Sequence, residues 1–396
     1  TRKESSAASD VYKRQVMTRK RLLIVVNYFH PYVSGVSEYA RNVAASLAEY
    51  HEVTVLTGRH LPDLPEQEFF EGYSLVRVKP LFFLDKGYIS FDFVVDFIRL
   101  SRQCDIVNLH LPMLESGLLS LLTSRPLLVT YQCDMAIVGS VLSRLAVFGV
   151  RLSMRLAIAR SKAVMVLSKD YAKSSPMVRG FLGKVNEVAP PNRFEHENMG
   201  GPSRLQSPNL VLGFVGRFVL EKGIEVIIEA ARILKDEPLE FWLAGDYKDV
   251  AGGSIYERLK SDIESLGGRV RLLGRLSNDE LIDFYRNIDV LLLPSTNRFE
   301  AFGMVQMEAM TFGATVVTSD MPGVRETVRK TKIGQLCEPG SGVSLADAIL
   351  RAQAERKSIS RDDVRAAVFR EFSNRKFVGD YLAMVNSLTR ANVAQE

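Results

Sequence analysis

Two basic residues near the middle of the chain are placed where they could bind an anion. Arg217 follows the apolar run NLVLGFVG, and Lys222 precedes the helical pattern GIEVIIEAARIL. The N-terminus of a helix offers free N–H groups and the positive end of the helix dipole, and both favour an anion. An arginine fork and a lysine point charge at this position could clamp a diphosphate. In the alternative interpretation they are incidental charges on a solvated helix start.

Two glutamates, Glu300 and Glu308, follow another apolar run, DVLLLP, and stand eight positions apart. We predict that the next helix begins near Phe302 or Gly303. Glu300 then lies in the loop before the helix, and Glu308 lies roughly one and a half turns into it, so their carboxylates would be about 10 Å apart. That span suits a nucleoside diphosphate sugar. Alternatively, Glu300 only caps the helix and Glu308 is a surface residue.

All four residues follow predicted strands, and such strands alternate with helical patterns along the chain. The first half contains the runs RLLIVVNY, HEVTVLT, YSLVRV, CDIVNLH, PLLVTY and AVMVLS, and the second half contains NLVLGFVG, LEFWLAG, RVRLLG, DVLLLP, ATVVTS and IGQLCE. Continuous apolar strands alternating with helices are typical of parallel sheets covered on both faces. We therefore predict an α/β protein with two Rossmann-like parallel-sheet domains facing a cleft. Ligands should bind at the carboxyl ends of the strands.

The length of 396 residues is too great for one ordinary core, so two domains are the default. The stretch APPNRFEHENMGGPSRLQSP is rich in Pro, Gly, Asn and Ser and separates the two sets of strands. The predicted segments are a foreign or disordered 1–16, a first Rossmann-like domain at 17–190, a linker at 191–208, a second Rossmann-like domain at 209–373, and a last helix at 374–396 that could return to the first domain.

Composition narrows the functional classes. No apolar run has the length of a transmembrane helix. Cys104, Cys133 and Cys337 are far apart and lack CxxC spacing, which favours a reducing compartment and argues against a structural zinc. Residues 1–195 hold 25 Lys+Arg against 18 Asp+Glu, a balance of +7, and the remainder holds 26 against 28, or −2. A basic first half indicates an anionic surface or acceptor, and no nucleic-acid motif accompanies it.

Three stretches together resemble one known family. The runs GRFVLEKG, GRLSNDELIDFYRNIDVLLLPST and FEAFGMVQMEAMTFGATVVTSDMPGVRETV are similar to those of family 4 retaining glycosyltransferases, which have the GT-B fold. The resemblance is strong from Leu210 to about Gly340 and looser in the first domain. It implies a hexosyltransferase that moves a sugar from a nucleoside diphosphate sugar, of UDP or GDP type, to a sugar or lipid-linked acceptor in glycolipid or polysaccharide assembly. The acceptor would bind the first domain and the donor the second.

The resemblance also implies roles for individual residues. Arg217 and Lys222 would stabilise the leaving diphosphate, Glu300 would contact the donor sugar, and Glu308 would contact the ribose. Because no Asp-x-Asp occurs in the chain, we predict no metal and no other cofactor. The remaining donor-binding candidates are Gly35, Gly216, Gly245, Arg275, Leu276, Phe302, Gly303, Met304 and Val305.

The first domain departs from the family pattern at two places. The family usually has two adjacent glycines after the first strand, where this chain has Ser34 and Gly35, and Gly35 could equally belong to an ordinary strand–helix turn. Family members often carry a histidine where this chain has Gln132, which can hydrogen-bond a sugar hydroxyl but cannot carry a proton. Asp134 and His110 are candidates on the same acceptor or donor-sugar side, and His110 also fits a purely structural role.

The helical stretch GSVLSRLAVFGVRLSMRLAIARSKA carries a basic stripe. At ~100° per residue, Arg144, Arg151, Arg155 and Lys162 fall within about 40° of one another. Such a helix could lie on an anionic membrane or bind a lipid-linked phosphate, or it could be a core helix with one solvated edge. We therefore predict a cytoplasmic protein that could be peripheral at the inner face of the membrane.

Two other classes of protein remain open. Doubly wound sheets also form NAD enzymes and nucleotide-sugar epimerases, although the first predicted strand here lacks the GxGxxG turn of a dinucleotide site. A non-catalytic subunit that binds a nucleotide sugar is the other alternative, suggested by Gln132. The donor sugar, its base, the acceptor and the oligomeric state are not legible in these residues.

Overall fold

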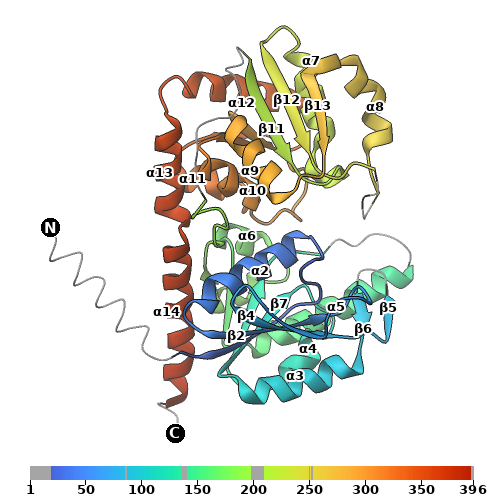
Figure 1. Cartoon of the computed structure of the whole chain (residues 1–396), viewed down its shortest axis with the longest axis vertical. Helices are drawn as coiled ribbons and strands as arrows, with labels where there is room; N and C mark the ends of the chain where they lie inside the picture. Colours follow the sequence, from blue (N-terminus) through green and yellow to red (C-terminus); the bar gives the residue numbers. More distant parts are fainter. Residues whose placement is uncertain are drawn as a thin grey trace, which may run out of the picture. The chain divides into compact units, whose positions relative to one another are not determined.

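The computed structural model describes residues 19–84, 87–135, 141–197, 209–248, 250 and 253–393. The chain divides into two compact units (Figure 1). Unit 1 comprises the described residues up to Pro191 together with those from Phe377 onward, and unit 2 comprises Asn192–Lys376. The predicted N-terminal segment at 1–16 lies outside the described residues, as do 198–208 of the predicted linker. Residues 192–197 of the predicted linker are described and belong to unit 2.

Unit 1 is built on one eight-stranded sheet in the order β10-β9-β8-β7-β1-β2-β4-β3, parallel except for the edge strand β3. The central strands are buried along their whole length, as expected for a sheet covered on both faces. A two-stranded antiparallel pair, β5 and β6, stands apart from the sheet. The strands are β1 (Arg21–Val25), β2 (Glu52–Gly58), β3 (Gln67–Phe70), β4 (Tyr73–Val78), β5 (Phe82–Leu84), β6 (Gly87–Ile89), β7 (Ile106–Leu111), β8 (Leu127–Tyr131), β9 (Ala163–Val166) and β10 (Val185–Glu187).

Helices cover this sheet, and the last of them begins in unit 2. Helix α14 (Asn374–Val393) belongs to unit 1 from Phe377 onward, where Asn108 Nδ2 lies 3.4 Å from the buried Tyr381 hydroxyl and Lys20 Nζ donates to Asn386 Oδ1 at 3.2 Å. The other helices are α2 (Gly35–Ala48), α3 (Phe91–Gln103), α4 (Ser116–Leu122), α5 (Val141–Arg160), α6 (Lys169–Ser174) and the 3-10 turn η1 (Arg179–Lys184).

Unit 2 contains a six-stranded parallel sheet in the order β13-β12-β11-β14-β15-β16. Its strands are β11 (Leu210–Val215), β12 (Leu239–Ala244), β13 (Val270–Gly274), β14 (Val290–Leu293), β15 (Thr315–Ser319) and β16 (Gln335–Cys337). Its helices are η2 (Leu220–Lys222), α7 (Ile224–Ile233), α8 (Tyr256–Ser265), η3 (Gly267–Arg269), α9 (Asn278–Asn287), α10 (Met304–Thr311), α11 (Glu326–Thr331), α12 (Gly342–Glu355) and α13 (Arg361–Phe372).

The predicted α/β class and the two parallel sheets are confirmed, and all twelve predicted strands are present. The strands β3, β5, β6 and β10 were not predicted. The strands β3 (QEFF) and β10 (VNE) contain polar residues and are not continuous apolar runs, and β5 and β6 have three residues each in a pair outside the sheet. Among the described residues, no helix is both long enough and apolar enough to cross a membrane.

Candidate functional site

The arrangement of the unit 2 sheet predicts where a ligand should bind. Strand β11 lies between β12 and β14, so the direction of winding reverses on either side of it. In open parallel sheets, ligands bind at the carboxyl ends of the strands beside such a reversal. The loops at these ends contain Gly216 and Arg217 after β11, Gly245 after β12, and Glu300 after β14.

Close backbone contacts hold the first of these loops together. The N–H of Gly216 donates to Ala244 O at 3.0 Å, and the N–H of Gly245 donates to Gly274 O at 2.7 Å. Gly245 has a φ of 138°, and a Cβ at this position would lie 1.9 Å from the carbonyl oxygen of Gly216. Only glycine therefore allows the exits of β11 and β12 to approach this closely.

A second close contact joins the loops after β11 and β14. Gly223 has a φ of 69°, and a Cβ there would lie 2.0 Å from the carbonyl oxygen of Pro294. The N–H of Thr296 donates to Glu221 O at 3.0 Å. These contacts bring the predicted cation and the predicted carboxylate together, because Lys222 Nζ forms an ion pair with Glu300 Oε2.

This ion pair is mostly shielded from water, with side-chain exposures of 22% for Lys222 and 17% for Glu300. Arg217, in contrast, is half-exposed, and its guanidinium lies 3.7 Å from the Glu221 carboxylate. Strand β11 ends at Val215 and helix α7 begins at Ile224, so both cations lie in the connection between the two elements. Within the described residues, no side chain caps the N-terminus of α7. The N–H of Val226 donates to Gly223 O, which leaves the N–H groups of Ile224 and Glu225 available to an anion.

Helix α10 presents a second uncapped N-terminus beside Glu300. It begins at Met304, close to the predicted start, with Gly303 as its N-cap at a φ of 78°. A Cβ on Gly303 would lie 2.3 Å from Leu293 Cδ2, so the turn packs directly against the end of β14. Phe302 is buried and its ring lies 5.7 Å from that of Phe372, whereas Met304 and Val305 are half-buried.

Glu308 is buried and not a surface residue, which excludes that alternative interpretation. Arg193 holds its carboxylate with two hydrogen bonds, Nε to Oε1 at 2.9 Å and Nη2 to Oε2 at 3.2 Å. The Tyr285 hydroxyl donates to Oε2 at 2.8 Å. Burial, and then the charge of Glu308, raises the pKa of Tyr285 well above its usual value. Glu308 thus sits in a bidentate pair, and its Oε1 keeps room for a further donor.

Sequence reasoning missed Arg193. It lies in the Pro- and Asn-rich stretch that reads as a linker, where a charged residue is expected to be solvated. Its guanidinium instead also lies over the ring of Phe194, 4.4 Å from the ring centroid. The only signal in the sequence is that Glu308 falls within the otherwise apolar and small pattern of α10, which implies a partner for its charge.

Arg275 and Leu276 lie in the short connection after β13. Gly274 has a φ of 70°, and Ser277 caps α9 by a reciprocal box with Glu280. Arg275 is exposed and Leu276 is half-buried. They therefore lie at the same carboxyl edge of the sheet as the residues above, with Gly274 O bound to Gly245 N–H.

The unit 1 candidates gather at the corresponding edge of their own sheet. His110 in β7 is fully buried, and its Nδ1 lies 3.0 Å from Gln132 Nε2, which also contacts Val36 O at 3.4 Å. Gly35 opens α2, capped by Ser34, one residue before that carbonyl. A Cβ on Gly35 would meet no atom of the described residues within 4 Å, so packing there does not require glycine.

Asp134 faces a different set of partners. Its Oδ1 accepts from the Tyr131 hydroxyl at 2.5 Å and from Ser175 Oγ at 2.7 Å, and its N–H donates to the Tyr171 hydroxyl at 2.7 Å. The carboxylate is buried. The structure thus brings His110, Gln132 and the start of α2 together, and it ties Asp134 into the network that secures β8 to α6.

Burial lowers the pKa of His110 to about 3, so the ring is neutral at physiological pH. The unfolded chain binds a proton near pH 6.5 and the folded chain does not, so unit 1 should lose stability as pH falls below 6.5. This loss continues down to about pH 3 and reaches about 2 kcal/mol for this group at pH 5. The opening free energy is measured by amide hydrogen exchange in β7 and β8 as a function of pH. Its slope against pH reports the difference in bound protons between the open and folded states, and we expect His110→Gln to lower that difference by about one proton. The exposed His196→Gln is the matched control, and an unchanged slope in His110→Gln would contradict the assignment.

Comparisons with known proteins agree with this arrangement. Residues 33–175 match the family model "Glycosyltransferase Family 4", and residues 197–367 match "Glycosyl transferases group 1". The chain is 34% identical over 167 residues to a D-inositol 3-phosphate glycosyltransferase of Corynebacterium urealyticum, covering 40% of this chain and 37% of that relative. It is 26% identical over 291 residues to the 2-deoxystreptamine N-acetyl-D-glucosaminyltransferase of Streptomyces fradiae, covering 66% and 67%. The chain thus spans little more than a third of the first relatives that it matches.

Solved structures show the same fold. The sucrose-phosphate synthase of Thermosynechococcus elongatus superimposes with a TM-score of 0.74 at 20% identity, over 96% of this chain and 100% of that one. An Anabaena protein solved in complex with UDP and glucose gives a TM-score of 0.67 at 18% identity, over 93% and 100%. At this level of identity the likeness concerns the fold alone.

Proposed function

Because this chain belongs to the family 4 glycosyltransferases, which have the GT-B fold, we propose that it moves a hexose from a UDP- or GDP-sugar to a sugar or lipid-linked acceptor. The observation that carries this proposal is the Lys222–Glu300 pair between the uncapped N-termini of α7 and α10. A diphosphate needs fixed positive charge and N–H donors. The sugar attached to it needs a carboxylate close to those two kinds of group. The carboxyl edge of the unit 2 sheet supplies all three.

Each residue then has a chemical task. Lys222 and Arg217 neutralise the negative charge that develops on the leaving diphosphate. Stabilisation of developing charge by fixed groups is usually the largest single contribution to catalysis. Glu300 accepts hydrogen bonds from the donor sugar, and Glu308 accepts one from the ribose through Oε1. The departing phosphate oxygen takes the proton of the acceptor hydroxyl on the same face. The anomeric configuration is therefore retained without a protein base.

Two measurements test this activity. Products are assayed with a panel of UDP-, GDP- and ADP-sugars and simple glycoside acceptors, and the anomeric configuration of any product is read by NMR. Transfer with retention supports the proposal. Inversion, or no transfer from any donor that binds, would contradict it.

The proposed reaction uses no metal. Support comes from the cations at the diphosphate end, and among the described residues no three His, Cys, Asp or Glu side chains gather as metal ligands. We expect excess EDTA to leave the transfer rate within about twofold of the untreated rate, because the stabilising charges belong to the protein. A metal-dependent enzyme would instead lose its charge stabilisation when the metal is removed. A larger loss that Mg²⁺ or Mn²⁺ restores would contradict metal independence.

A second function is a non-catalytic subunit that binds a nucleotide sugar. It is favoured by Gln132, which occupies the place of the family histidine and is engaged with His110. The two functions separate when a nucleotide sugar raises the melting temperature of the protein but yields neither transfer nor hydrolysis. A ligand at 100 times its Kd adds ~2.7 kcal/mol to stability, enough for a clear shift.

We place the protein in the cytoplasm, peripheral to the inner face of the membrane where lipid-linked acceptors are assembled. Cys104 and Cys337 are buried as free thiols, and burial raises the pKa of each to about 11, which suits a reducing compartment. The basic stripe predicted for this helix is altered in the structure, because α5 ends at Arg160 and Lys162 lies beyond it. Arg151 is half-buried and donates to Met135 O at 3.2 Å, because it lies on the side of the helix that faces unit 1.

A further inference from the structure

Helices α4 and α5 of unit 1 lie side by side (Figure 1), and both carry exposed side chains. The N–H of Gly117 donates to Ser153 Oγ at 2.8 Å, and Arg160 Nε donates to Ser120 O at 3.0 Å. A Cβ on Gly117 would lie 2.8 Å from Ser153 O, so the two helix backbones are as close as glycine permits. The exposed residues of the two helices therefore form one continuous surface.

That surface is apolar. We define the α4–α5 face by six exposed side chains, which are Leu118, Leu121, Leu122, Phe148, Leu152 and Leu156. Phe148 is 67% exposed, Leu152 60% and Leu121 52%, far more than residues of these types usually are. On each helix the members recur three or four positions apart, so they share one side. The opposite side of α5 buries Met154, Ala157 and Ile158 in the unit 1 core.

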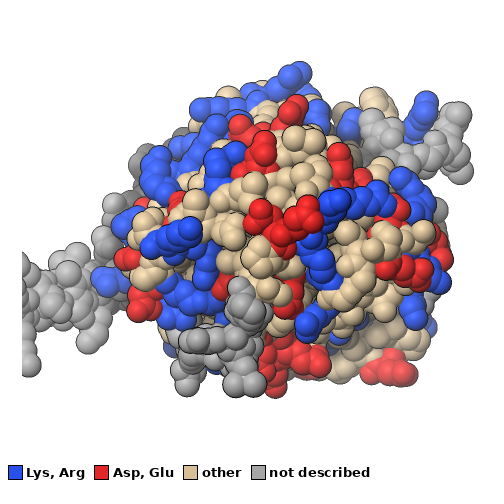
Figure 2. Space-filling model, turned by 90° about the horizontal axis from the view of Figure 1, so that it is seen from above, with Lys and Arg blue, Asp and Glu red and all other residues tan. Residues whose placement is uncertain are grey.

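The charge carried by the two helices themselves has one sign. Residues 116–169 contain seven Lys or Arg and a single acidic residue, Asp134, which is buried. Arg144, Arg155, Arg160 and Lys162 are exposed. In contrast, the face of the molecule drawn in Figure 2 shows lysines and arginines intermixed with aspartates and glutamates. An apolar surface on two helices that carry basic and no acidic side chains is complementary to an anionic, partly apolar partner.

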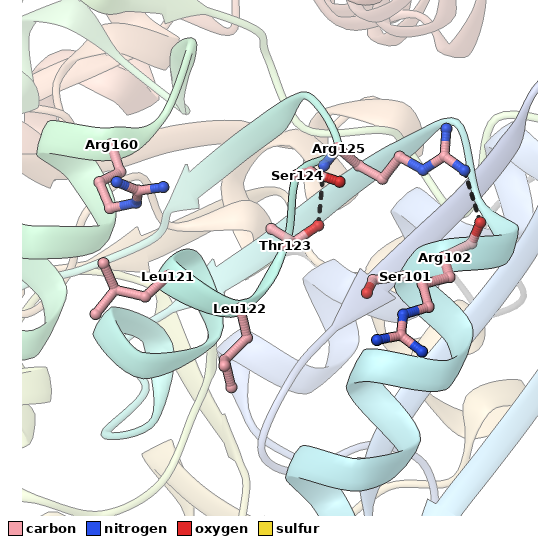
Figure 3. Close-up of a pocket in the computed structure, with 8 residues that line it drawn as sticks. All are labelled: Ser101, Arg102, Leu121, Leu122, Thr123, Ser124, Arg125 and Arg160. Atoms are coloured by element: carbon pink, nitrogen blue, oxygen red, sulfur yellow. Dashed lines mark hydrogen bonds between the residues drawn. The ribbon is translucent and has the colours of Figure 1, made fainter.

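The end of the face opens into a pocket of about 490 Å³ (Figure 3). Leu121 and Leu122 contribute its apolar side, and Arg102, Arg125 and Arg160 contribute its basic side. Arg125 Nη2 donates to Arg102 O at 2.7 Å, which places Arg125 at the C-terminus of α3. The lining residues precede strands β7, β8 and β9, so the pocket lies at the amino edge of the sheet and not at the candidate functional site.

We propose that the α4–α5 face is the surface by which this protein docks onto an anionic lipid bilayer. The leucines and Phe148 enter the boundary between headgroups and acyl chains, and the arginines around them bind lipid phosphates. Arg102, Arg125 and Arg160 line the pocket beside Leu121 and Leu122, so headgroup phosphates can bind these arginines where the apolar layer begins. This inference gives the proposed peripheral placement a defined surface, and its test requires no transferase activity.

Charge and composition favour a bilayer over a second copy of the chain. A two-fold interface between copies would bring the same arginines against one another, with no acidic residue on α4 or α5 to compensate. A bilayer supplies many phosphates at once and needs no shape match to exposed leucines. Each lysine or arginine near an anionic surface strengthens binding about fivefold.

The full chain is tested by co-sedimentation with vesicles of phosphatidylcholine alone and of phosphatidylcholine mixed with phosphatidylglycerol. We expect binding to the mixed vesicles only, weakened by high salt. Leu152→Glu and the double variant Arg144→Glu/Arg155→Glu should each lower the partition coefficient at least about tenfold. Val343→Glu on α12 and Lys260→Glu on α8 change exposed residues of unit 2 in the same way and should bind like the wild type.

Three results would overturn the proposal. Equal binding to neutral and anionic vesicles would contradict a role for the arginines. Equal loss of vesicle binding in the unit 2 control variants would contradict the assignment to the α4–α5 face. Elution of the wild type as a dimer that Leu152→Glu converts to a monomer would show that a second copy covers the face. Transfer to a soluble acceptor should be unchanged in Leu152→Glu, so failure of membrane docking and failure of the proposed transfer reaction are told apart.

Discussion

Lys222→Ala should lower turnover by about 10²-fold or more, because it removes a fixed positive charge from the leaving diphosphate. The ammonium is held where the loops after β11 and β14 meet, at a position that Gly223 and Pro294 bring within reach of Glu300. Arg217→Ala should have an effect of the same order. The measurement is the rate of sugar transfer at saturating donor, with melting temperature followed in parallel.

The pairing with Glu300 makes a control necessary. Removing Lys222 also leaves a mostly shielded carboxylate without its cation, which could lower stability without touching the chemistry. Lys222→Arg keeps the charge and should recover part of the turnover, whereas the exposed Lys357→Ala should change neither quantity. Near-normal turnover in both Lys222→Ala and Arg217→Ala would remove the proposed mechanism.

The largest loss of stability is expected from Arg193→Ala. Glu308 would keep only the hydrogen bond from Tyr285 while remaining buried, and breaking a buried pair by removing one partner costs about 3 kcal/mol or more. Trp242, the single tryptophan of the chain, lies in β12 and reports the unfolding of unit 2 by its fluorescence. Urea unfolding followed at this residue gives the free energy directly.

Two further variants separate the buried charge from simple loss of packing. Arg193→Met combined with Glu308→Leu removes both charges and should recover much of the stability, since apolar replacement of a buried pair is often neutral. Arg232→Ala breaks the exposed Arg232–Asp262 pair of the same unit and should cost at most about 1 kcal/mol. If Arg193→Ala and Arg232→Ala proved equally mild, Arg193 would not be what holds Glu308.

Much of the fold could be predicted because parallel strands are buried on both faces and read as continuous apolar runs. The edge strands β3 (QEFF) and β10 (VNE) are not buried along their whole length and contain polar residues, so they leave no such signal. The Lys222–Glu300 contact was foreseeable as two residues on loops of one sheet edge, but not as an ion pair. That contact depends on the backbone approach at Gly223, which is a three-dimensional fact.

Other features, on α4 and α5 and at the candidate site, were out of reach of the sequence. A helical period places Arg151 and Arg155 on one arc of α5 but does not say which end of the arc turns toward the protein, and Arg151 turned inward. The exposure of Leu118 and Leu121 on α4 was not predicted, because the sequence does not reveal that the neighbouring helix leaves them uncovered. Arg193 was hidden for the opposite reason, since its surroundings resemble a solvated connection.

The points at which the chain enters and leaves unit 2 are neighbours. Asn192 N–H donates to Asn374 Oδ1 at 2.7 Å, and Asn374 Nδ2 donates to Asn192 O at 3.0 Å. The first residue of unit 2 is thus hydrogen-bonded to a residue near its last one. Segments whose two ends lie close together are those that tolerate insertion of one domain into another. Unit 2, to which we assign the nucleotide sugar, thus has its entry and exit joined by these two asparagines. Exchanging it between relatives would require only two adjacent junctions.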